Sequence, residues 1–225
     1  MVRWLQGRCR SCGDVLLCNE LAGVCPPCRW GWPVLSDSEA TQMLCQTRAG
    51  IRVFGVGFRL CQASGTHEVI HRTKYGAFPE TAQSLGKWVA ERWQPPPCHA
   101  TLVPVPLHWR RRWKRGFNQA EAFAQGLSHA WGAKVNADIL VRTIHKTSLT
   151  ATSRAERQKA LGHVFHAPPH SGRPVILVDD VLTTGATARI CAEAMRRAGH
   201  EILGGVWMAL ASSTGWNLLL MMGLD

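Results

Sequence analysis

The stretch from Val175 to Thr187, which reads VILVDDVLTTGAT, combines residue types that could bind a sugar phosphate. The apolar run Val175 to Val178 is short and rich in β-branched residues, a pattern typical of a strand buried on both faces. Asp179 and Asp180 follow directly, and their carboxylates can accept hydrogen bonds from sugar hydroxyls or hold Mg²⁺. We therefore expect an acidic pair where a buried strand ends.

The residues after this pair form a small, hydroxyl-rich loop that opens a helix. Its members are Thr183, Thr184, Gly185, Ala186 and Thr187. Backbone N–H groups at the start of a helix are unpaired and carry partial positive charge, so they attract a phosphate. Gly185 permits close approach of the backbone, and the threonine hydroxyls add donors. The stretch thus predicts a ribose 5-phosphate site; the alternative is an ordinary buried strand and turn whose acids cap a helix.

Four cysteines near the start of the chain have the spacing of a metal site. Cys9 and Cys12 form one CxxC pair, Cys25 and Cys28 form another, and twelve residues separate the pairs. Four thiolates in a tetrahedral shell favour zinc, and a segment so short and so poor in apolar residues needs such a clamp to fold. We predict a structural zinc site; the alternative is four unrelated thiols, and Cys18 in the spacer is a competing ligand.

A basic segment follows a second predicted strand, Leu102 to Pro106 (LVPVP), whose prolines place the strand end there. The run from Arg110 to Arg115 carries five cations and an interleaved tryptophan, and we expect it to be a loop. In a parallel sheet it would lie at the same edge as the phosphate loop, where open α/β sheets bind ligands. The run has three interpretations: a solvated loop, an anion clamp, or a nucleic-acid patch.

The remaining elements complete an alternating α/β pattern. A helix is predicted to begin near Asn118, whose side chain can cap it, with Glu121 three positions on as in a capping box. Another helix opens at Pro79, and strands are predicted over 51–60 and 202–210. Between residues 51 and 97, Lys74 is the one candidate for function, and a solvated lysine is the interpretation we favour there.

Composition limits the domain organisation and the partners. The 225 residues suit one α/β domain, placed at 46–225, after a small zinc ribbon and linker at 1–45. A net charge of +11 and a pI near 9.7 indicate anionic partners or a solvated basic surface. Nine cysteines, several of them isolated, favour a reducing compartment. Because no apolar run approaches the roughly 20 residues of a membrane span, we expect a cytoplasmic protein.

Two stretches resemble known families. VILVDDVLTTGAT is similar to the phosphoribosyl-diphosphate (PRPP) signature of type I phosphoribosyltransferases. Val103 to Gln119 resembles the distinctive motif of the ComF/GntX family, in which a four-cysteine segment precedes a phosphoribosyltransferase-like domain. This resemblance implies an α/β, parallel-sheet type I phosphoribosyltransferase fold with a small N-terminal zinc ribbon. It also implies PRPP binding and a link to DNA uptake, natural competence and transformation.

The resemblance implies a chemistry for the individual residues. A phosphoribosyltransferase displaces pyrophosphate from C1 of PRPP, with Asp179 and Asp180 on the ribose hydroxyls and Mg²⁺ and the loop from Thr183 to Thr187 on the 5-phosphate. Arg115 would neutralise the leaving pyrophosphate, and Asn118 belongs to the same motif. Relatives that salvage 6-oxopurines carry a catalytic aspartate where this chain has Thr183, so hypoxanthine and guanine are not the expected acceptors.

Departures from the family leave the acceptor open. The family usually has a glutamine before the position of Ser153, where this chain reads Ser148-Leu149-Thr150, and an asparagine where it has Ala160. Two functions therefore stand. One is a phosphoribosyltransferase of unknown acceptor; the other is a non-catalytic PRPP- or nucleotide-sensing accessory protein that binds single-stranded DNA and a competence helicase or other partner. The sequence does not indicate the oligomeric state.

Overall fold

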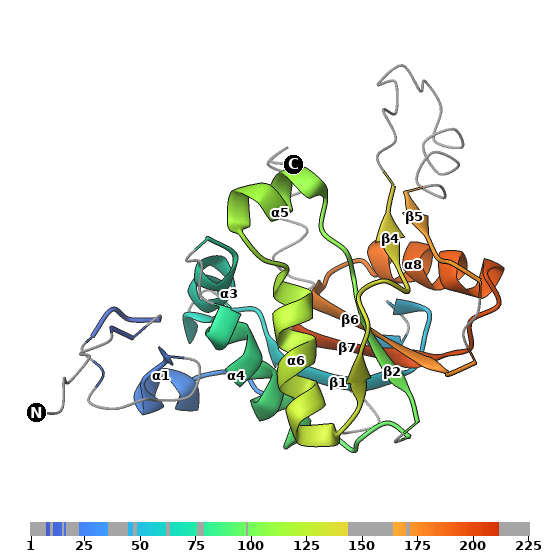
Figure 1. The fold of residues 1–225 in the computed structure, drawn as a ribbon. Helices are drawn as coiled ribbons and strands as arrows, with labels where there is room; N and C mark the ends of the chain where they lie inside the picture. Colours follow the sequence, from blue (N-terminus) through green and yellow to red (C-terminus); the bar gives the residue numbers. More distant parts are fainter. Residues whose placement is uncertain are drawn as a thin grey trace, which may run out of the picture.

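A five-stranded parallel sheet forms the centre of the computed structural model, with the strand order β1-β7-β6-β2-β3 (Figure 1). The model describes residues 8–9, 11–14, 16, 23–35, 45–46, 49–61, 64–75, 79–97, 99–143, 164–169 and 172–211. The strands of the sheet are β1 (Val53–Arg59), β2 (Thr101–Pro104), β3 (Lys134–Val135), β6 (Val175–Leu182) and β7 (Ile202–Leu210). A separate antiparallel pair consists of β4 (Val141–Arg142) and β5 (Phe165–His166). The predicted parallel α/β class is confirmed.

The central strand β6 is longer than its apolar run. Val175 to Val178 have no exposed surface, as a strand covered on both faces requires. Pairing with β7 nevertheless continues from Asp179 opposite Trp207 to Leu182 opposite Leu210. The prediction that the strand ends at the acidic pair was therefore wrong, because backbone pairing continues through the partly buried acids to the buried Leu182.

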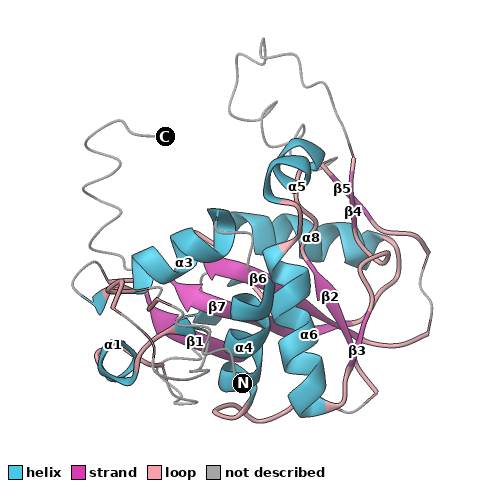
Figure 2. Cartoon of the chain, turned by 60° about the vertical axis from the view of Figure 1, so that its left-hand side comes forward, coloured by secondary structure: helices cyan, strands magenta, loops and turns pink. Residues whose placement is uncertain are grey.

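Helices cover the sheet on both faces (Figures 1 and 2). The helices α4 (Pro79–Ala90) and α6 (Gln119–Trp131) lie together on one face, and α8 (Ala186–Arg197) lies on the other. Gly86 and Gly126 let α4 and α6 approach closely, because a Cβ at either position would meet the backbone of the other helix. Close packing of these two helices fixes the start of α6 relative to the sheet.

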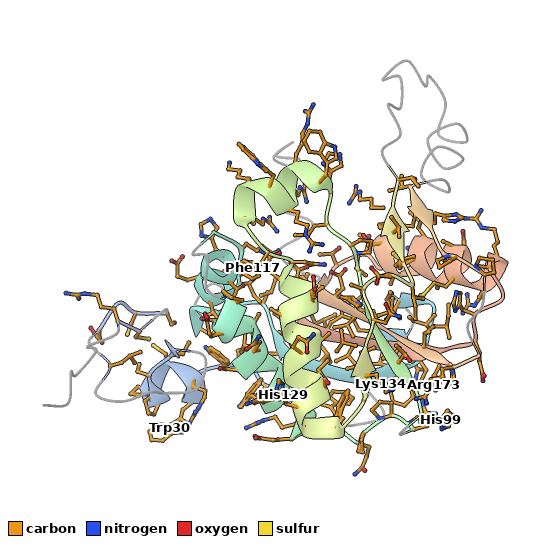
Figure 3. All side chains as sticks on the ribbon, viewed as in Figure 1. Trp30, His99, Phe117, His129, Lys134 and Arg173 are labelled. Carbon is orange, nitrogen blue, oxygen red and sulfur yellow. The ribbon has the colours of Figure 1, made fainter. Side chains whose placement is uncertain are left out.

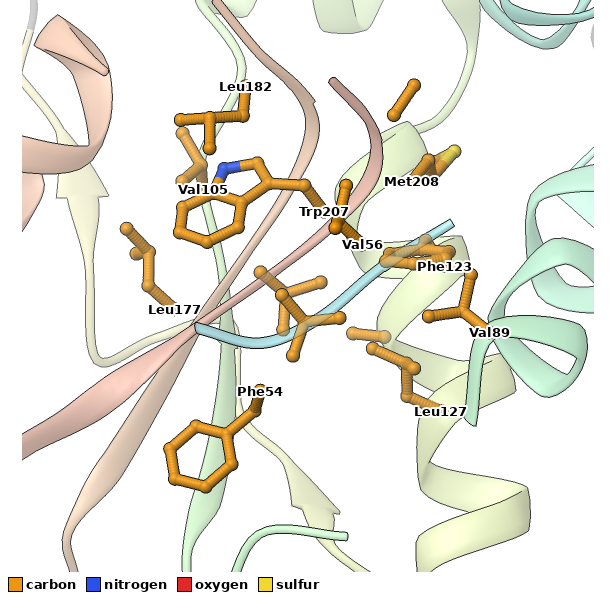
Figure 4. Close-up of a cluster of buried hydrophobic side chains, with 14 of the residues drawn as sticks. Phe54, Val56, Val89, Val105, Phe123, Leu127, Leu177, Leu182, Trp207 and Met208 are labelled. Atoms are coloured by element: carbon orange, nitrogen blue, oxygen red, sulfur yellow. The ribbon is translucent and has the colours of Figure 1, made fainter. Parts of the chain in front are cut away.

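The two edges of the sheet carry different segments of the chain. His99, Lys134 and Arg173 precede or begin strands and lie at the amino edge, whereas Phe117 lies at the opposite, carboxyl edge (Figure 3). Figure 4 shows a cluster of buried side chains in the core, among them Phe123 and Leu127 of α6 and Met208 of β7. The carboxyl edge is where α3 (Thr66–Tyr75), the basic segment and the phosphate loop converge.

The basic segment is a helix, so the prediction of a loop was wrong. Helix α5 spans Trp109–Arg115. Nδ1 of His108 accepts the N–H of Arg110 at its start, and Gly116, with φ of 78°, donates its N–H to the carbonyl of Arg112 at its end. A capped start and a left-handed glycine stop are sufficient signals for a short helix of arginines and tryptophans.

The segment after the second CxxC pair covers an edge of the sheet. A short helix, α1 (Pro26–Trp30), leads into Val34, which forms an antiparallel bridge with Phe58 of the edge strand β1. Trp32 packs on Phe58 and on Trp88 of α4, with ring centroids 4.8 Å and 5.6 Å apart. The bridge and the ring contacts cover part of the edge strand β1. An uncovered edge strand can pair with another chain.

Most other sequence predictions of elements hold. Asn118 caps α6, and α4 begins at Pro79. The predicted strands over 51–60 and 202–210 are β1 and β7. Several positions lie outside the described residues: Cys18, Ser148, Arg154, Ala160 and the tail from residue 212 onwards.

Candidate functional site

The acidic pair lies at the carboxyl edge of β6 and holds a lysine from a distant helix. Nζ of Lys74, at the end of α3, lies 3.0 Å from a carboxylate oxygen of Asp180. The backbone N–H of Asp180 donates to the Asp179 carboxylate over 2.8 Å, and that of Val181 donates to the Asp180 carboxylate over 2.7 Å. Both acids are thus oriented by their own strand. The prediction of a solvated Lys74 was wrong.

The pair has an unusual charge state. Burial raises the pKa of Asp179 from its ordinary 3.8 to about 8, and the neighbouring charge of Asp180 adds to the rise. The N–H of Asp180 and the charge of Lys74 act in the opposite direction and lower the pKa. One lysine therefore does not compensate two adjacent carboxylates. A divalent cation or hydrogen-bond donors from a ligand would favour the doubly charged form.

The loop after β6 presents its backbone at the start of α8. Gly185 adopts φ of 76°, the left-handed region that favours glycine, and offers no side chain to cap the helix. Thr184, Ala186 and Thr187 are exposed, whereas Thr183 is partly buried. The first turn of α8 contains no acidic residue, which leaves its positive end uncompensated by charge. These are the local features of an anion-binding helix start.

A hydrogen-bond chain connects the basic segment to the acidic pair. Arg115 donates to Oε1 of Gln119 over 3.1 Å, and Nε2 of Gln119 donates to the carbonyl of Lys74 over 3.4 Å. Gln119 is buried, so this bridge lies within the structure rather than on its surface. It fixes the end of α3 against the start of α6 and so places Lys74 next to Asp180.

Asn118 acts in the scaffold. Its Oδ1 accepts the N–H of Ala120, and its Nδ2 donates to the carbonyl of Val105 over 3.0 Å. The side chain is buried and joins the end of β2 to the start of α6. Direct contact of Asn118 with a substrate remains a prediction. Glu121 forms an ion pair with Arg112 at 3.8 Å and thereby connects α6 to α5.

Helix α5 exposes every one of its large side chains to some degree. Trp113 is 88% exposed and Trp109 is 50% exposed, and none of the helix residues is buried. Desolvation and the nearby guanidinium groups of Arg142, Arg110 and Arg111 lower the pKa of His108, which precedes the helix. The helix therefore forms a basic surface with two accessible indole rings beside the carboxyl edge (Figure 3).

The four predicted metal-ligating cysteines come together. The Sγ atoms of Cys9, Cys12, Cys25 and Cys28 all lie within 4.8 Å of one another, so this cluster could hold a metal ion. The N–H of Ser11 and the N–H of Cys25 donate to Sγ of Cys9 over 3.4 Å and 3.3 Å. Such N–H···S bonds stabilise the thiolate form of a cysteine that ligates a metal.

The pKa values within the cluster diverge because burial and hydrogen bonds act differently on each thiol. Burial raises the pKa of Cys9, but backbone N–H groups of Cys25, Cys12 and Ser11 outweigh it and lower the value to about 6. The pKa of Cys12 is raised to about 11, and the values of Cys25 and Cys28 are also raised. One thiolate forms readily, and a bound cation would favour ionisation of the other three.

The sequence did not reveal every residue of the site. Gln119 carried no signal beyond its place in a resemblance motif, and its bridging role depends on the packing of α3 against α6. The side chain of Lys74 was predicted to be solvated, because no local spacing connects it to a carboxylate 106 positions later in the chain. Only the tertiary structure brings these residues to the acidic pair.

The fold and the site define an α/β protein whose parallel sheet carries an acidic pair and a glycine-capped helix start at its carboxyl edge. The chain is 31% identical over 138 residues to the DNA utilization protein YhgH of Escherichia coli K12, covering 58% of this chain and 61% of that protein. It is 34% identical over 104 residues to Competence protein F of Haemophilus influenzae, covering 44% of this chain and 45% of that protein. It is 31% identical over 107 residues to Competence protein ComFC of Bacillus subtilis, covering 46% of this chain and 41% of that protein. These relatives confirm the resemblance to the ComF family.

The matches cover only part of each relative. The chain spans about three fifths of the length of the YhgH proteins and less than half of the two competence proteins. No family model matches the chain. Among solved structures, that of the allosteric regulatory enzyme of purine biosynthesis is 18% identical with a TM-score of 0.42, covering 62% of this chain and 30% of that chain. Within the described residues, no helix combines the length and the apolar character that crossing a membrane requires.

The raised pKa of Asp179 predicts how stability depends on pH. In the ligand-free chain the folded state keeps a proton that the unfolded state releases above 3.8, so stability should fall as pH rises from 3.8 towards about 8. Asp179→Asn removes this titration. We expect the variant to gain several degrees in melting temperature at about pH 7.5 and much less at about pH 5, as measured by thermal denaturation.

The matched control is Asp138→Asn, which alters an exposed carboxylate. It should leave the melting temperature nearly unchanged at both pH values. An equal shift at both pH values for Asp179→Asn would contradict the assigned charge state.

Proposed function

We propose that the chain binds PRPP together with Mg²⁺ at the carboxyl edge of the sheet. The observation that carries the proposal is that β6 leads through a short loop into the glycine-capped start of α8, so that Asp179 and Asp180 precede a helix start by only a few residues. Carboxylates are ligands for Mg²⁺ and acceptors for ribose hydroxyls, and the helix start accepts a phosphate. A ribose 5-phosphate carries both groups on one small molecule.

The named residues would divide the ligand between them. Asp179 and Asp180 would hold the ribose hydroxyls and Mg²⁺, and the loop with Thr183, Thr184, Gly185, Ala186 and Thr187 would hold the 5-phosphate. Lys74 supports this arrangement because it already supplies one positive charge at Asp180. Arg115, bonded to Gln119 beside the same edge, is the candidate for the pyrophosphate side.

The reaction that fits such a site is transfer of the ribosyl group with release of pyrophosphate. A nucleophile would attack C1 while Mg²⁺ and a cation stabilise the leaving group. Thr183 follows the acidic pair by three positions and cannot act as a general base at neutral pH, so a 6-oxopurine is not the proposed acceptor. The relatives' names connect the family to DNA utilization and competence, and we propose a role beside DNA uptake in a reducing, cytoplasmic setting.

A second candidate function is a non-catalytic PRPP- or nucleotide-sensing protein that also binds single-stranded DNA. The exposed tryptophans and cations of α5 favour it, since such a surface can stack bases and neutralise phosphates. A screen of nucleobases, amines and DNA for pyrophosphate release separates the two functions. Turnover with any acceptor supports the enzyme, and binding of PRPP without turnover supports the sensor.

The chain would consist of a zinc ribbon and linker at 1–45 and a phosphoribosyltransferase-like domain at 46–225. A tetrahedral shell of four thiolates suits zinc, and with no open ligand position the ion would be structural. The mutual approach of Cys9, Cys12, Cys25 and Cys28 supports this proposal.

The zinc proposal predicts about one zinc per chain in metal analysis of the purified protein. Cys9→Ser should abolish stoichiometric zinc because it removes the thiol with the lowest pKa. Cys191→Ser, at a buried cysteine outside the cluster, is the control that keeps the metal. A folded, metal-free wild-type protein would overturn the ribbon.

The PRPP proposal predicts Mg²⁺-dependent binding by calorimetry. Asp179→Ala combined with Asp180→Ala should reduce the affinity by at least about tenfold, because it removes the ligands for Mg²⁺ and the ribose hydroxyls. Asp138→Ala, at an exposed acid outside the acidic pair and its loop, serves as the control and should bind normally. Unchanged binding by the double variant would contradict the assignment of Asp179 and Asp180 to the PRPP site.

If α5 contacts single-stranded DNA, binding of an oligothymidine should weaken steeply with salt. Arg111→Ala with Arg112→Ala should lower the slope of log affinity against log salt by about 1.4, because roughly 0.7 is lost per phosphate contact. The matched control is Lys134→Ala with Arg173→Ala, two exposed cations at the opposite edge. Equal effects of the two pairs would indicate unspecific attraction to a basic protein.

A further inference from the structure

A cavity lies away from the carboxyl edge of the sheet, between α4 and the segment that carries the four cysteines. Its volume is about 440 Å³, within the range of ligand-binding clefts. Six residues line it: Arg29, Trp30, Val34, Trp88, Glu91 and Arg92. Trp30 projects from α1 at the side of the molecule away from α5 (Figure 3). Neither the acidic pair nor the phosphate loop contributes to this cavity.

The walls of the cavity are fixed relative to each other. Trp32, two residues after Trp30, packs on Trp88 of α4 and on Phe58 of β1. Val34 bridges the backbone of Phe58, and the N–H of Leu35 donates to the carbonyl of Gly57 over 3.1 Å. The cysteine segment is therefore attached to the domain at this point. A preformed cavity loses less entropy on binding than one that must assemble.

The cavity carries an excess of positive charge. The guanidinium of Arg92 lies 4.0 Å over the ring of Trp88, donates to the Trp88 carbonyl over 2.7 Å and reaches Glu91 at 3.9 Å. Burial and the nearby charge of Arg29 lower the pKa of Arg92, whereas Glu91 acts against them. Two guanidinium groups and one exposed carboxylate thus line the cavity, and an additional anion would balance the charge.

The same cavity presents apolar surface to solvent. Trp30 is 78% exposed and Val34 is 45% exposed, although both border a site of buried aromatic packing. Tryptophan and arginine are the residue types enriched at the energetic centres of protein interfaces. The cavity combines two of each around one valine and one glutamate.

We propose that this cavity docks a segment of a partner protein in which an apolar side chain stands next to a carboxylate. The apolar group would enter between Trp30, Val34 and Trp88, and the carboxylate would pair with Arg29 and Arg92. Glu91 favours a peptide over a nucleic acid, because a carboxylate accepts the N–H groups of a peptide backbone but repels a chain of phosphates. The proposal does not depend on the proposed function of the carboxyl edge.

Selection from a phage-displayed library of short random peptides against the purified full-length chain tests the proposal. We expect enriched peptides with Asp or Glu beside Leu, Ile or Phe, and synthetic versions should bind in fluorescence anisotropy. Trp30→Ala should weaken that binding at least about tenfold, and Arg29→Ala should do the same independently. Replacing the peptide's acidic residues by amides should cause a comparable loss.

Trp113→Ala is the matched control, since it removes a similarly exposed tryptophan from α5. It should leave peptide binding unchanged. Selection of no peptide whose affinity depends on both Trp30 and Arg29 would overturn the proposal. So would a loss of oligothymidine binding in Trp30→Ala larger than in Trp113→Ala, which would make the cavity a nucleic-acid site.

Discussion

The parallel pairing of β2 with β6 is the constraint on which the carboxyl edge depends. Thr101 lies opposite Val175 and Pro104 opposite Val178, and the N–H of Val105 extends the ladder by donating to the carbonyl of Val178 over 2.8 Å. Because β2 ends opposite Val178, the residue before the acidic pair, the chain leaving β2 and the acidic pair of β6 lie at one edge. Asn118 then bonds back to Val105, so the start of α6 is tied to the same point. A slip of this register would separate the basic segment from the acids.

The charge at this edge is unfavourable for the stability of the free chain. Asp179 and Asp180 lie adjacent within a strand, and Lys74 provides one compensating charge. Ionising both carboxylates costs free energy in the free chain, and a bound cation would lower that cost. The bridge from Arg115 through Gln119 to Lys74 connects that site to the basic helix α5. The acidic pair and helix α5 therefore share one network of hydrogen bonds and an ion pair.

Local signals allowed much of this arrangement to be predicted, and tertiary contacts account for the rest. The buried run of β6, the cap at Asn118 and the paired CxxC spacing all act over a few residues, so the sequence displays them directly. The ion pair of Lys74 with Asp180 joins parts of the chain that only folding brings together. Helix α5 was mistaken for a loop because its capping residues, His108 and Gly116, are weak signals beside a run of charge. The cavity at Trp30 had no sequence signal, since its walls come from α1 and α4.

The central claim is that one edge of the sheet binds a ribose 5-phosphate with its diphosphate and Mg²⁺. A crystal structure of the chain with PRPP and Mg²⁺ tests it most directly. We expect the 5-phosphate to lie against the backbone N–H groups of the loop from Thr184 to Thr187, with the ribose hydroxyls at Asp179 and Asp180. Ligand density elsewhere, such as along α5 alone, or a 5-phosphate turned away from the start of α8 would contradict it.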